Sequence, residues 1–186
     1  MMWQWVINIM RSTNRQLILI FLLSLFFNSA LANGAVTNCT QDETPVFSCT
    51  MRNKKILSLC STDNNKFLTY RYGKSGQIEF TYPSEKTASD KIFSYSHYFR
   101  YRTDYFILSF TNQDHRYAVF RYYSDDGSSN DEPVMAGVSV TNLVSEKEYT
   151  NRCKTIESDS ISILRDYIPC DPNGDFGCKS NEDNKQ

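Results

Sequence analysis

The sequence has few of the residues and motifs that mark a metalloenzyme or a hydrolase. Its 186 residues include two histidines, and they contain no Cys-x-x-Cys pair and no Gly-x-Ser-x-Gly nucleophile motif. The usual sequence patterns of a zinc site and of a serine nucleophile are therefore missing. We expect no catalytic residues, no bound metal and no cofactor.

Long apolar runs are also lacking after the first 32 residues. The run Leu17 to Phe27 has 11 residues, about half of the ~20 that span a bilayer. Arg11 and Arg15 precede it and Ala30-Leu31-Ala32 follows, which is the pattern of an export signal cleaved after its last alanine. The sequence thus predicts residues 1–32 as a signal peptide, no stable membrane anchor, and a periplasmic or secreted location.

The sequence carries no excess of positive charge. Its 20 Lys and Arg residues stand against 21 Asp and Glu residues, and the basic residues are scattered among the acidic ones. Removing the predicted signal of 32 residues, which holds two arginines and no acid, leaves 154 residues with 18 basic and 21 acidic side chains. This balance argues against nucleic acid as a partner, and the length suits one domain.

Aromatic residues and period-two alternation dominate what is present. Gly73-Lys74-Ser75-Gly76 connects two alternating runs, so residues 66–83 are predicted as a β-hairpin. In the run Ile92 to Arg102 the odd-numbered residues, including Phe99, are predicted to face the core. Eight strands are predicted, over residues 45–51, 55–61, 68–72, 77–82, 92–102, 105–111, 116–123 and 134–141.

This spacing predicts an all-β fold, either a single antiparallel meander sheet or an up-and-down β-barrel of about eight strands. A short C-terminal helix is predicted over residues 158–167, with a Ser or Asp cap and three apolar residues on one side, Ile161, Leu164 and Ile168. We therefore divide the mature chain into a β-domain, residues 33–157, and a short helix with a disulfide-closed polar tail, residues 158–186.

The even number of cysteines in a chain with an export signal predicts disulfide bonds. Cys170 and Cys178 enclose a turn-rich loop and are predicted to pair. Cys49 and Cys60 are not, because a two-residue turn between their strands would leave them about four residues out of register. One early cysteine is therefore expected to reach Cys153. The six disulfide cysteines are Cys39, Cys49, Cys60, Cys153, Cys170 and Cys178.

The C-terminal loop partly matches a calcium-binding loop. It has oxygen-bearing residues at relative positions 1, 3, 5 and 12 of an EF-hand loop, namely Asp171, Asn173, Asp175 and Glu182. Phe176 stands at position 6, where that loop requires glycine. The prediction is a disulfide-closed polar tail, with calcium binding as the alternative.

Neither histidine indicates catalysis by its position. His97 lies on the apolar side of its predicted strand, where a hydrogen-bonded core histidine is expected rather than a general base. His115 follows Asp114 in a predicted turn, where exposure to solvent is expected.

A candidate binding surface lies around the turn that follows the fifth predicted strand. Tyr and Arg are the residue types most enriched at the centres of protein interfaces. Under the predicted register the outer face of this region carries Tyr98, Arg100, Arg102 and Tyr105. The sequence therefore predicts a protein-binding patch at these residues.

The segments FSC at Phe47, KKILSLC at Lys54 and LTYRYGK at Leu68 carry a family resemblance. In them the chain resembles uncharacterised small periplasmic or secreted proteins of Gram-negative bacteria, which implies a location but no activity. In size, compartment and disulfides it is also similar to small periplasmic β-barrel inhibitors of lysozyme.

The function expected from the sequence is that of an exported, non-enzymatic β-domain. It would bind an unidentified protein partner of the cell envelope, as an inhibitor or an immunity protein does. The alternative function is an envelope hydrolase that uses dispersed carboxylates, because a carboxylate pair needs no local motif.

Overall fold

The computed structural model describes residues 35–125 and 133–178. The predicted signal peptide and residues 179–186 of the tail lie outside these described residues. Ala35–Gln186 forms one compact unit. No helix within the described part of the chain is long and apolar enough to span a membrane.

Nine antiparallel strands form one meander sheet with the order β4-β3-β2-β1-β9-β8-β7-β6-β5. This confirms the predicted all-β fold, and of its two forms the sheet is the one present, because the sheet does not close into a barrel. The strands are β1 (Thr44–Met51), β2 (Ile56–Thr62), β3 (Phe67–Lys74), β4 (Gln77–Tyr82), β5 (Ser94–Arg100), β6 (Thr103–Asn112), β7 (His115–Ser124), β8 (Val134–Asn142) and β9 (Glu148–Asp159).

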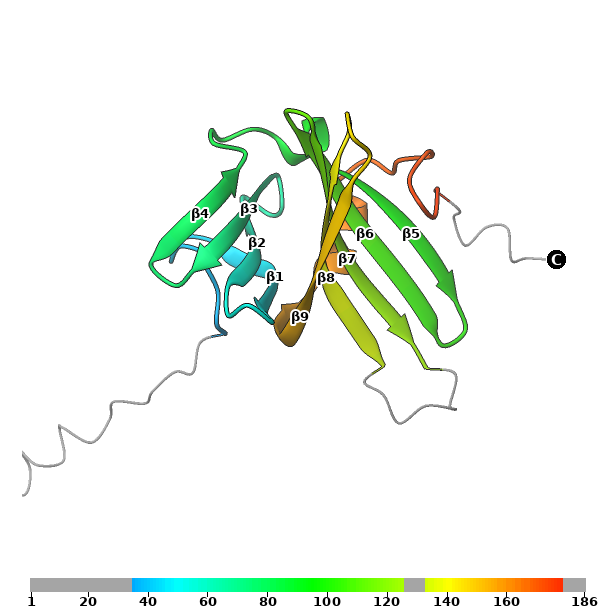
Figure 1. Cartoon of the computed structure of the whole chain (residues 1–186), viewed down its shortest axis with the longest axis horizontal. Helices are drawn as coiled ribbons and strands as arrows, with labels where there is room; N and C mark the ends of the chain where they lie inside the picture. The colour runs from blue at the N-terminus through cyan, green and yellow to red at the C-terminus, as the bar shows by residue number, and fades with distance from the viewer. Residues whose placement is uncertain (1–34, 126–132, 179–186) are drawn as a thin grey trace, which may run out of the picture. The chain divides into compact units, whose positions relative to one another are not determined.

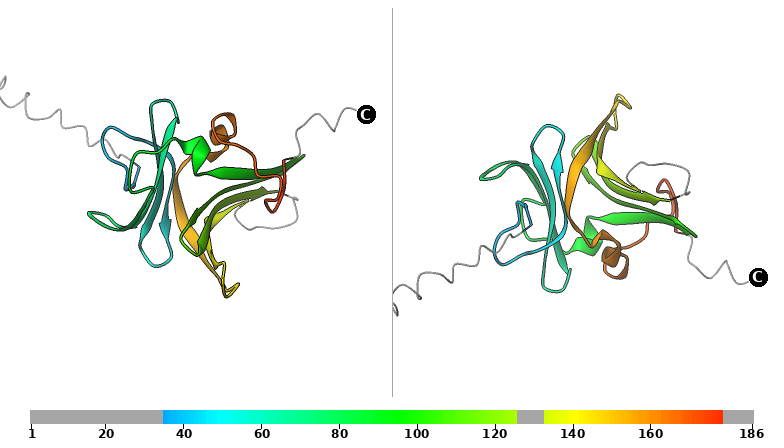
Figure 2. Two further views of the ribbon diagram at one scale, coloured as in Figure 1. Left: turned by 90° about the horizontal axis from the view of Figure 1, so that it is seen from above. Right: turned by 90° about the horizontal axis from the view of Figure 1, so that it is seen from below.

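The sheet is coiled so that its two ends face one another. β4 and β5 follow each other in the chain, with the short 3-10 helix η1 (Ser89–Lys91) between them, yet they form opposite edges of the sheet. Figures 1 and 2 show β1–β4 and β5–β8 as two groups with β9 between them. Aromatic contacts join the groups: the ring of Tyr82 stacks on Phe110 at 4.4 Å, and Phe80 stacks on Tyr117 at 5.1 Å.

The core fills the space between these two groups of strands. Phe47 and Leu59 from the first group and Phe106 and Leu108 from the second are fully buried. The predicted helix over residues 158–167 is wrong: Ser158 and Asp159 end β9, and a 3-10 helix, η2 (Ile161–Asp166), follows. The predicted apolar side is nevertheless present, because Ile161, Leu164 and Ile168 are all buried against the core.

The predicted strand over residues 92–102 is too long, and its inward-facing side chains are not all buried. β5 ends at Arg100, and Phe99, predicted to be buried, is 54% exposed. The cross-strand neighbour of Phe99 is Asp104, so at this position the strand extends beyond the last layer of apolar side chains. The predicted hairpin over residues 66–83 is confirmed as β3 and β4, joined by Ser75 and Gly76.

Three disulfides connect all six cysteines. The predicted Cys170–Cys178 bond is confirmed, and Cys49 is the early cysteine that reaches Cys153. Cys60 pairs with Cys39, not with Cys49, because Cys49 lies opposite Leu57 in the β1–β2 ladder. Three such bonds are typical of proteins in an oxidising compartment outside the cytoplasm.

Candidate functional site

The turn between β5 and β6 presents four consecutive side chains to solvent, Phe99 to Arg102, which we call the hairpin tip. Arg100 pairs with Thr103 across the two strands, so the turn itself consists of Tyr101 and Arg102. The side chain of Tyr101 is 88% exposed. The hairpin tip therefore combines two exposed aromatic rings with two exposed guanidinium groups.

Polar contacts hold the backbone of the hairpin tip in place. Arg102 adopts a left-handed φ of 58°, and its carbonyl oxygen accepts a hydrogen bond of 3.0 Å from the N–H of Asp125. Its guanidinium also lies 2.7 Å from the carboxylate of Asp125. Arg100 donates from Nε to Thr103 Oγ1 at 3.3 Å. These bonds fix the turn while leaving the side chain of Tyr101 in solvent.

The two predicted tyrosines lie at the base of this hairpin. The rings of Tyr98 and Tyr105 are 6.0 Å apart. Phe176 from the C-terminal loop packs against both of them and against Tyr122, with ring distances of 5.6 to 6.3 Å. Of the four predicted patch residues, Arg100 and Arg102 reach solvent, whereas Tyr98 and Tyr105 are half-buried supports.

The C-terminal loop also covers the open edge of β5. Tyr95 donates its N–H to the carbonyl of Pro169 at 3.0 Å and accepts from the N–H of Asp171 at 2.7 Å. A Cβ atom added at Gly174 would lie 2.7 Å from that of Ser96, so the loop approaches β5 closely. The segment closed by Cys170–Cys178 therefore supports the hairpin that carries the tip.

Three of the four residues of the alternative calcium site lie in this loop. The carboxylate of Asp171 accepts a hydrogen bond of 2.9 Å from the N–H of Asn173, and that of Asp175 lies 3.8 Å from Arg116. Glu182, the predicted twelfth ligand, lies outside the described residues. Calcium binding at these residues therefore remains a prediction.

A chain of four charged or polar side chains crosses the sheet from β5 to β9. His97 Nε2 lies 2.7 Å from Asp104, and the other oxygen of Asp104 lies 3.2 Å from Arg121. Arg121 in turn donates from Nε to Asp159 at 2.8 Å. His97 is thus the hydrogen-bonded histidine that the sequence predicts. His115, the other histidine, lies 3.2 Å from the amide of Asn142 and is half-buried.

Asp104, one carboxylate of these four linked side chains, lacks the raised pKa of a general acid. The hydrogen bond from His97 outweighs the opposing effect of burial and, with the charges of His97, Arg121 and Arg165, lowers the pKa of Asp104. A glycosidase-type pair needs one carboxyl group with a raised pKa that can donate a proton. Asp104 is ionised at neutral pH, and Asp104 and Asp159 share Arg121 as partner.

The lowered pKa of Asp104 makes a testable prediction about pH. Because the folded-state pKa lies below the unfolded value, ionised Asp104 stabilises the fold above about pH 4, and this contribution is lost as the pH falls through the folded-state pKa. We expect Asp104→Asn to lower the free energy of unfolding by about 1–2 kcal/mol near pH 7, and by less near pH 3. Urea unfolding at a series of pH values measures this. A difference that stays constant or grows toward low pH would contradict it.

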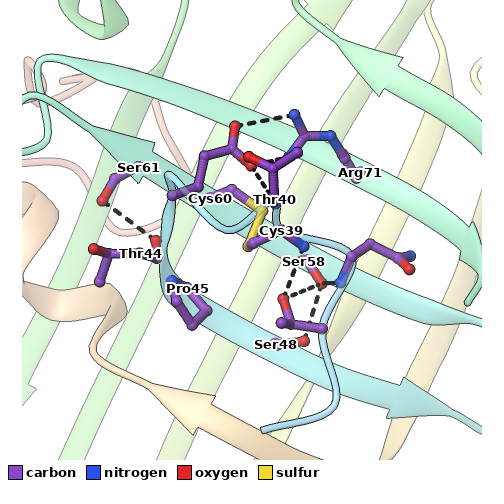
Figure 3. Close-up of a disulfide and its surroundings, with 12 residues drawn as sticks. Cys39, Thr40, Thr44, Pro45, Ser48, Ser58, Cys60, Ser61 and Arg71 are labelled. Atoms are coloured by element: carbon purple, nitrogen blue, oxygen red, sulfur yellow. Dashed lines mark hydrogen bonds and ion pairs between the residues drawn. A yellow bond between two sulfur atoms is a disulfide. The ribbon is translucent and has the colours of Figure 1, made fainter. Parts of the chain in front are cut away.

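A second ionised carboxylate lies near the Cys39–Cys60 disulfide, shown in Figure 3. Burial alone would raise the pKa of Glu43, but hydrogen bonds from Arg71 and Thr40 and the charge of Arg71 lower it. Cys39, Glu43 and Cys60 are the one set of closely spaced metal-ligand types within the described residues. Their sulfurs form a disulfide and Glu43 is bonded to Arg71, so this cluster is structural.

The same corner attaches the N-terminal segment to the sheet. The N–H of Asn38 donates to Ser58 Oγ at 2.9 Å, and the hydroxyls of Ser48 and Ser58 are 3.0 Å apart. Both serines are fully buried. These bonds satisfy buried polar groups under the segment and explain why the outer face of β1 and β2 carries serine (Figure 3).

A groove that the sequence does not predict lies on the described part of the chain. It has a volume of about 730 Å³ and lies between the beginning of β8 and the second half of β9. Its charged lining residues are Arg52, Arg152, Lys154 and Asp159. β9 has no strict alternation of apolar residues, and Cys153, half-buried within a polar run, is the one local sign of a strand there.

No protein-family model matches the sequence, and comparison with curated proteins and with solved structures finds no match. The resemblance to small periplasmic or secreted proteins therefore remains a prediction, and the function is argued from the geometry alone.

Proposed function

We propose that the protein binds a protein partner outside the cytoplasm, in the periplasm or the surrounding medium, and that the hairpin tip makes the central contact. The observation that carries the proposal is the composition of this fixed turn, where two exposed aromatic side chains, Phe99 and Tyr101, alternate with two exposed arginines. The protein would act without catalysis, as an inhibitor or an immunity protein does.

The composition of the hairpin tip favours binding. Tyrosine and arginine recur among the residues that dominate interface energies, and a large ring fixed by few rotatable bonds loses little entropy when it is bound. The turn is already held by Asp125 and Thr103, so little backbone ordering remains to be done on association. The hairpin tip suits insertion into a concave surface of the partner.

The charge of the hairpin tip suggests the character of that surface. Arg100 and Arg102 lie on either side of Tyr101, and both guanidinium groups are exposed. A partner site with an apolar floor and an acidic rim would accept the rings and pair with Arg100, whereas Arg102 is already held by Asp125. The alternative function, an envelope hydrolase that uses dispersed carboxylates, stays a prediction.

The test compares two tyrosines that are exposed to a similar degree. Tyr101 is 88% and Tyr149 is 72% exposed, and Tyr149 lies on β9, away from the hairpin tip. The mature domain is immobilised, and partners from cell-envelope extract are captured and quantified by mass spectrometry. We expect Tyr101→Ala to weaken capture at least about 10-fold and Tyr149→Ala to leave it unchanged.

Arg100→Ala extends the same comparison to charge. We expect it to weaken capture and to change the free energy of unfolding by less than about 0.5 kcal/mol, because the side chain is exposed. If Tyr101→Ala and Arg100→Ala both retain the captured partner at the level of Tyr149→Ala, the hairpin tip is not the binding surface.

A further inference from the structure

We propose that the groove between β8 and β9 binds an extended, acidic peptide segment as an additional strand. This site is separate from the hairpin tip, and the proposal does not depend on the function proposed above. The residues that line the groove come from β8, from β9 and from the turn after β1, and they include three cationic and four apolar ones.

The groove exists because β9 changes partner along its length. Thr141↔Glu148 to Gly137↔Arg152 pair β8 with the first part of β9. From Cys153 onward β9 pairs with β1, and two β-bulges interrupt this second ladder. Bulges bend a strand and increase its twist, which carries the second half of β9 away from β8.

The divergence leaves strand edges open on both sides of the groove. Residues 134–136 of β8 pair with β7 at their other edge, and the register gives them no partner on β9. Among the described strands, residues 153–159 of β9 likewise pair with β1 alone. Unpaired N–H and C=O groups along such edges are the element to which an added strand binds.

The charges of the groove select an acidic segment. Arg52, Arg152 and Lys154 are exposed, and the N–H of Arg52 donates to the carbonyl of Arg152 at 3.3 Å, which brings the first two together. Asp159 is the acidic residue among the lining side chains, and Arg121 already pairs with it at 2.8 Å. The unbalanced charge at the groove is therefore positive, complementary to Asp and Glu side chains.

The apolar lining adds a second requirement. Ala136 and Ile156 pack on the core side, whereas Met135 is 37% exposed. Successive side chains of a strand point to opposite faces. A segment that alternates acidic and apolar residues would place its apolar side chains against the core-side lining and its carboxylates beside Arg152 and Lys154.

Backbone pairing favours a peptide over other anions of the cell envelope. An anionic polysaccharide could form ion pairs with the cationic side chains, but it has no regular series of N–H and C=O groups to pair with the two open strand edges. The volume of about 730 Å³ is within the range of sites that enclose a ligand. The polysaccharide is therefore an outcome that the experiment must separate from the peptide.

The test uses the full mature domain and a fluorescein-labelled peptide of about eight alternating Glu and Val residues, a usual strand length. Fluorescence anisotropy gives the dissociation constant. We expect saturable binding, at least about 10-fold weakening in Arg152→Glu/Lys154→Glu, and unchanged binding in Lys74→Glu/Lys91→Glu, which reverses two exposed charges outside the groove. Circular dichroism checks that both variants are folded.

Two further probes separate strand pairing from simple charge attraction. The same peptide with N-methyl groups on alternate residues cannot donate its hydrogen bonds and should bind at least about 10-fold more weakly. Equal binding of the N-methylated peptide, or of a Lys and Val peptide, would overturn the proposal. Groove-dependent binding of polygalacturonate in place of the Glu and Val peptide would overturn it as well. Tyr101→Ala should not affect this binding, so failure here is distinct from failure at the hairpin tip.

Discussion

Replacing Cys49 and Cys153 with alanine should lower the free energy of unfolding by about 4–5 kcal/mol. This disulfide spans 104 residues of sequence, and opening it restores the conformational entropy of a large loop to the unfolded chain. It also joins β1 to β9, the pairing that connects the two groups of strands. A loss of this size approaches the whole stability of a marginally stable domain.

The control for this variant is the pair Cys170→Ala/Cys178→Ala. That bond spans eight residues, for which the same entropy relation gives about 2.5 kcal/mol. Urea unfolding of both variants without reductant provides the comparison. An equal or larger loss in the control would contradict the dependence on loop length from which both values are derived.

Phe106→Ala should lower the free energy of unfolding by about 3–5 kcal/mol, whereas Phe99→Ala should cost less than about 1 kcal/mol. Phe106 is fully buried, so truncation leaves a cavity, and its ring stacks on Tyr95 at 5.5 Å. Phe99 is 54% exposed and loses little contact. Thermal and urea unfolding measure both. A large cost for Phe99→Ala would support the burial that the sequence predicts for residue 99.

Alternation identified the strands that have one buried and one exposed face. β3 and β4 are the clearest case, because apolar and polar residues alternate on both sides of a glycine-containing turn. β9 was not predicted, because its side chains are mostly exposed on both faces and its place is fixed by pairing with β8 and β1. The same pairing with β1 extends β9 to Asp159 and removes the first residues of the predicted helix.

Inward orientation could be predicted for Phe99, but burial could not. Period-two alternation states which face a side chain occupies, and Phe99 does lie beside His97 on that face, with rings 6.4 Å apart. Where the core ends depends on the cross-strand partner, here Asp104. That partner is set by the register of the whole sheet.

The candidate binding residues show the same limit. The sequence predicted Arg100 and Arg102 on the outer face of a strand over residues 92–102, whereas Arg100 ends β5 and Arg102 lies in the turn that follows, both exposed. It did not indicate that Phe176 covers Tyr98 and Tyr105, because that contact joins residues some 70 positions apart and has no local pattern. The groove between β8 and β9 was missed for the same reason, since it arises from a change of strand partner.

Site-specific photocrosslinking tests the central claim, binding through the hairpin tip, most directly. A photoreactive phenylalanine analogue replaces Tyr101 in one variant and Tyr149 in another, both at exposed positions. After irradiation in cell-envelope extract, our account predicts one discrete covalent adduct at position 101 and at least about 10-fold less at position 149. An adduct that forms equally at both positions, or at position 149 alone, would contradict it.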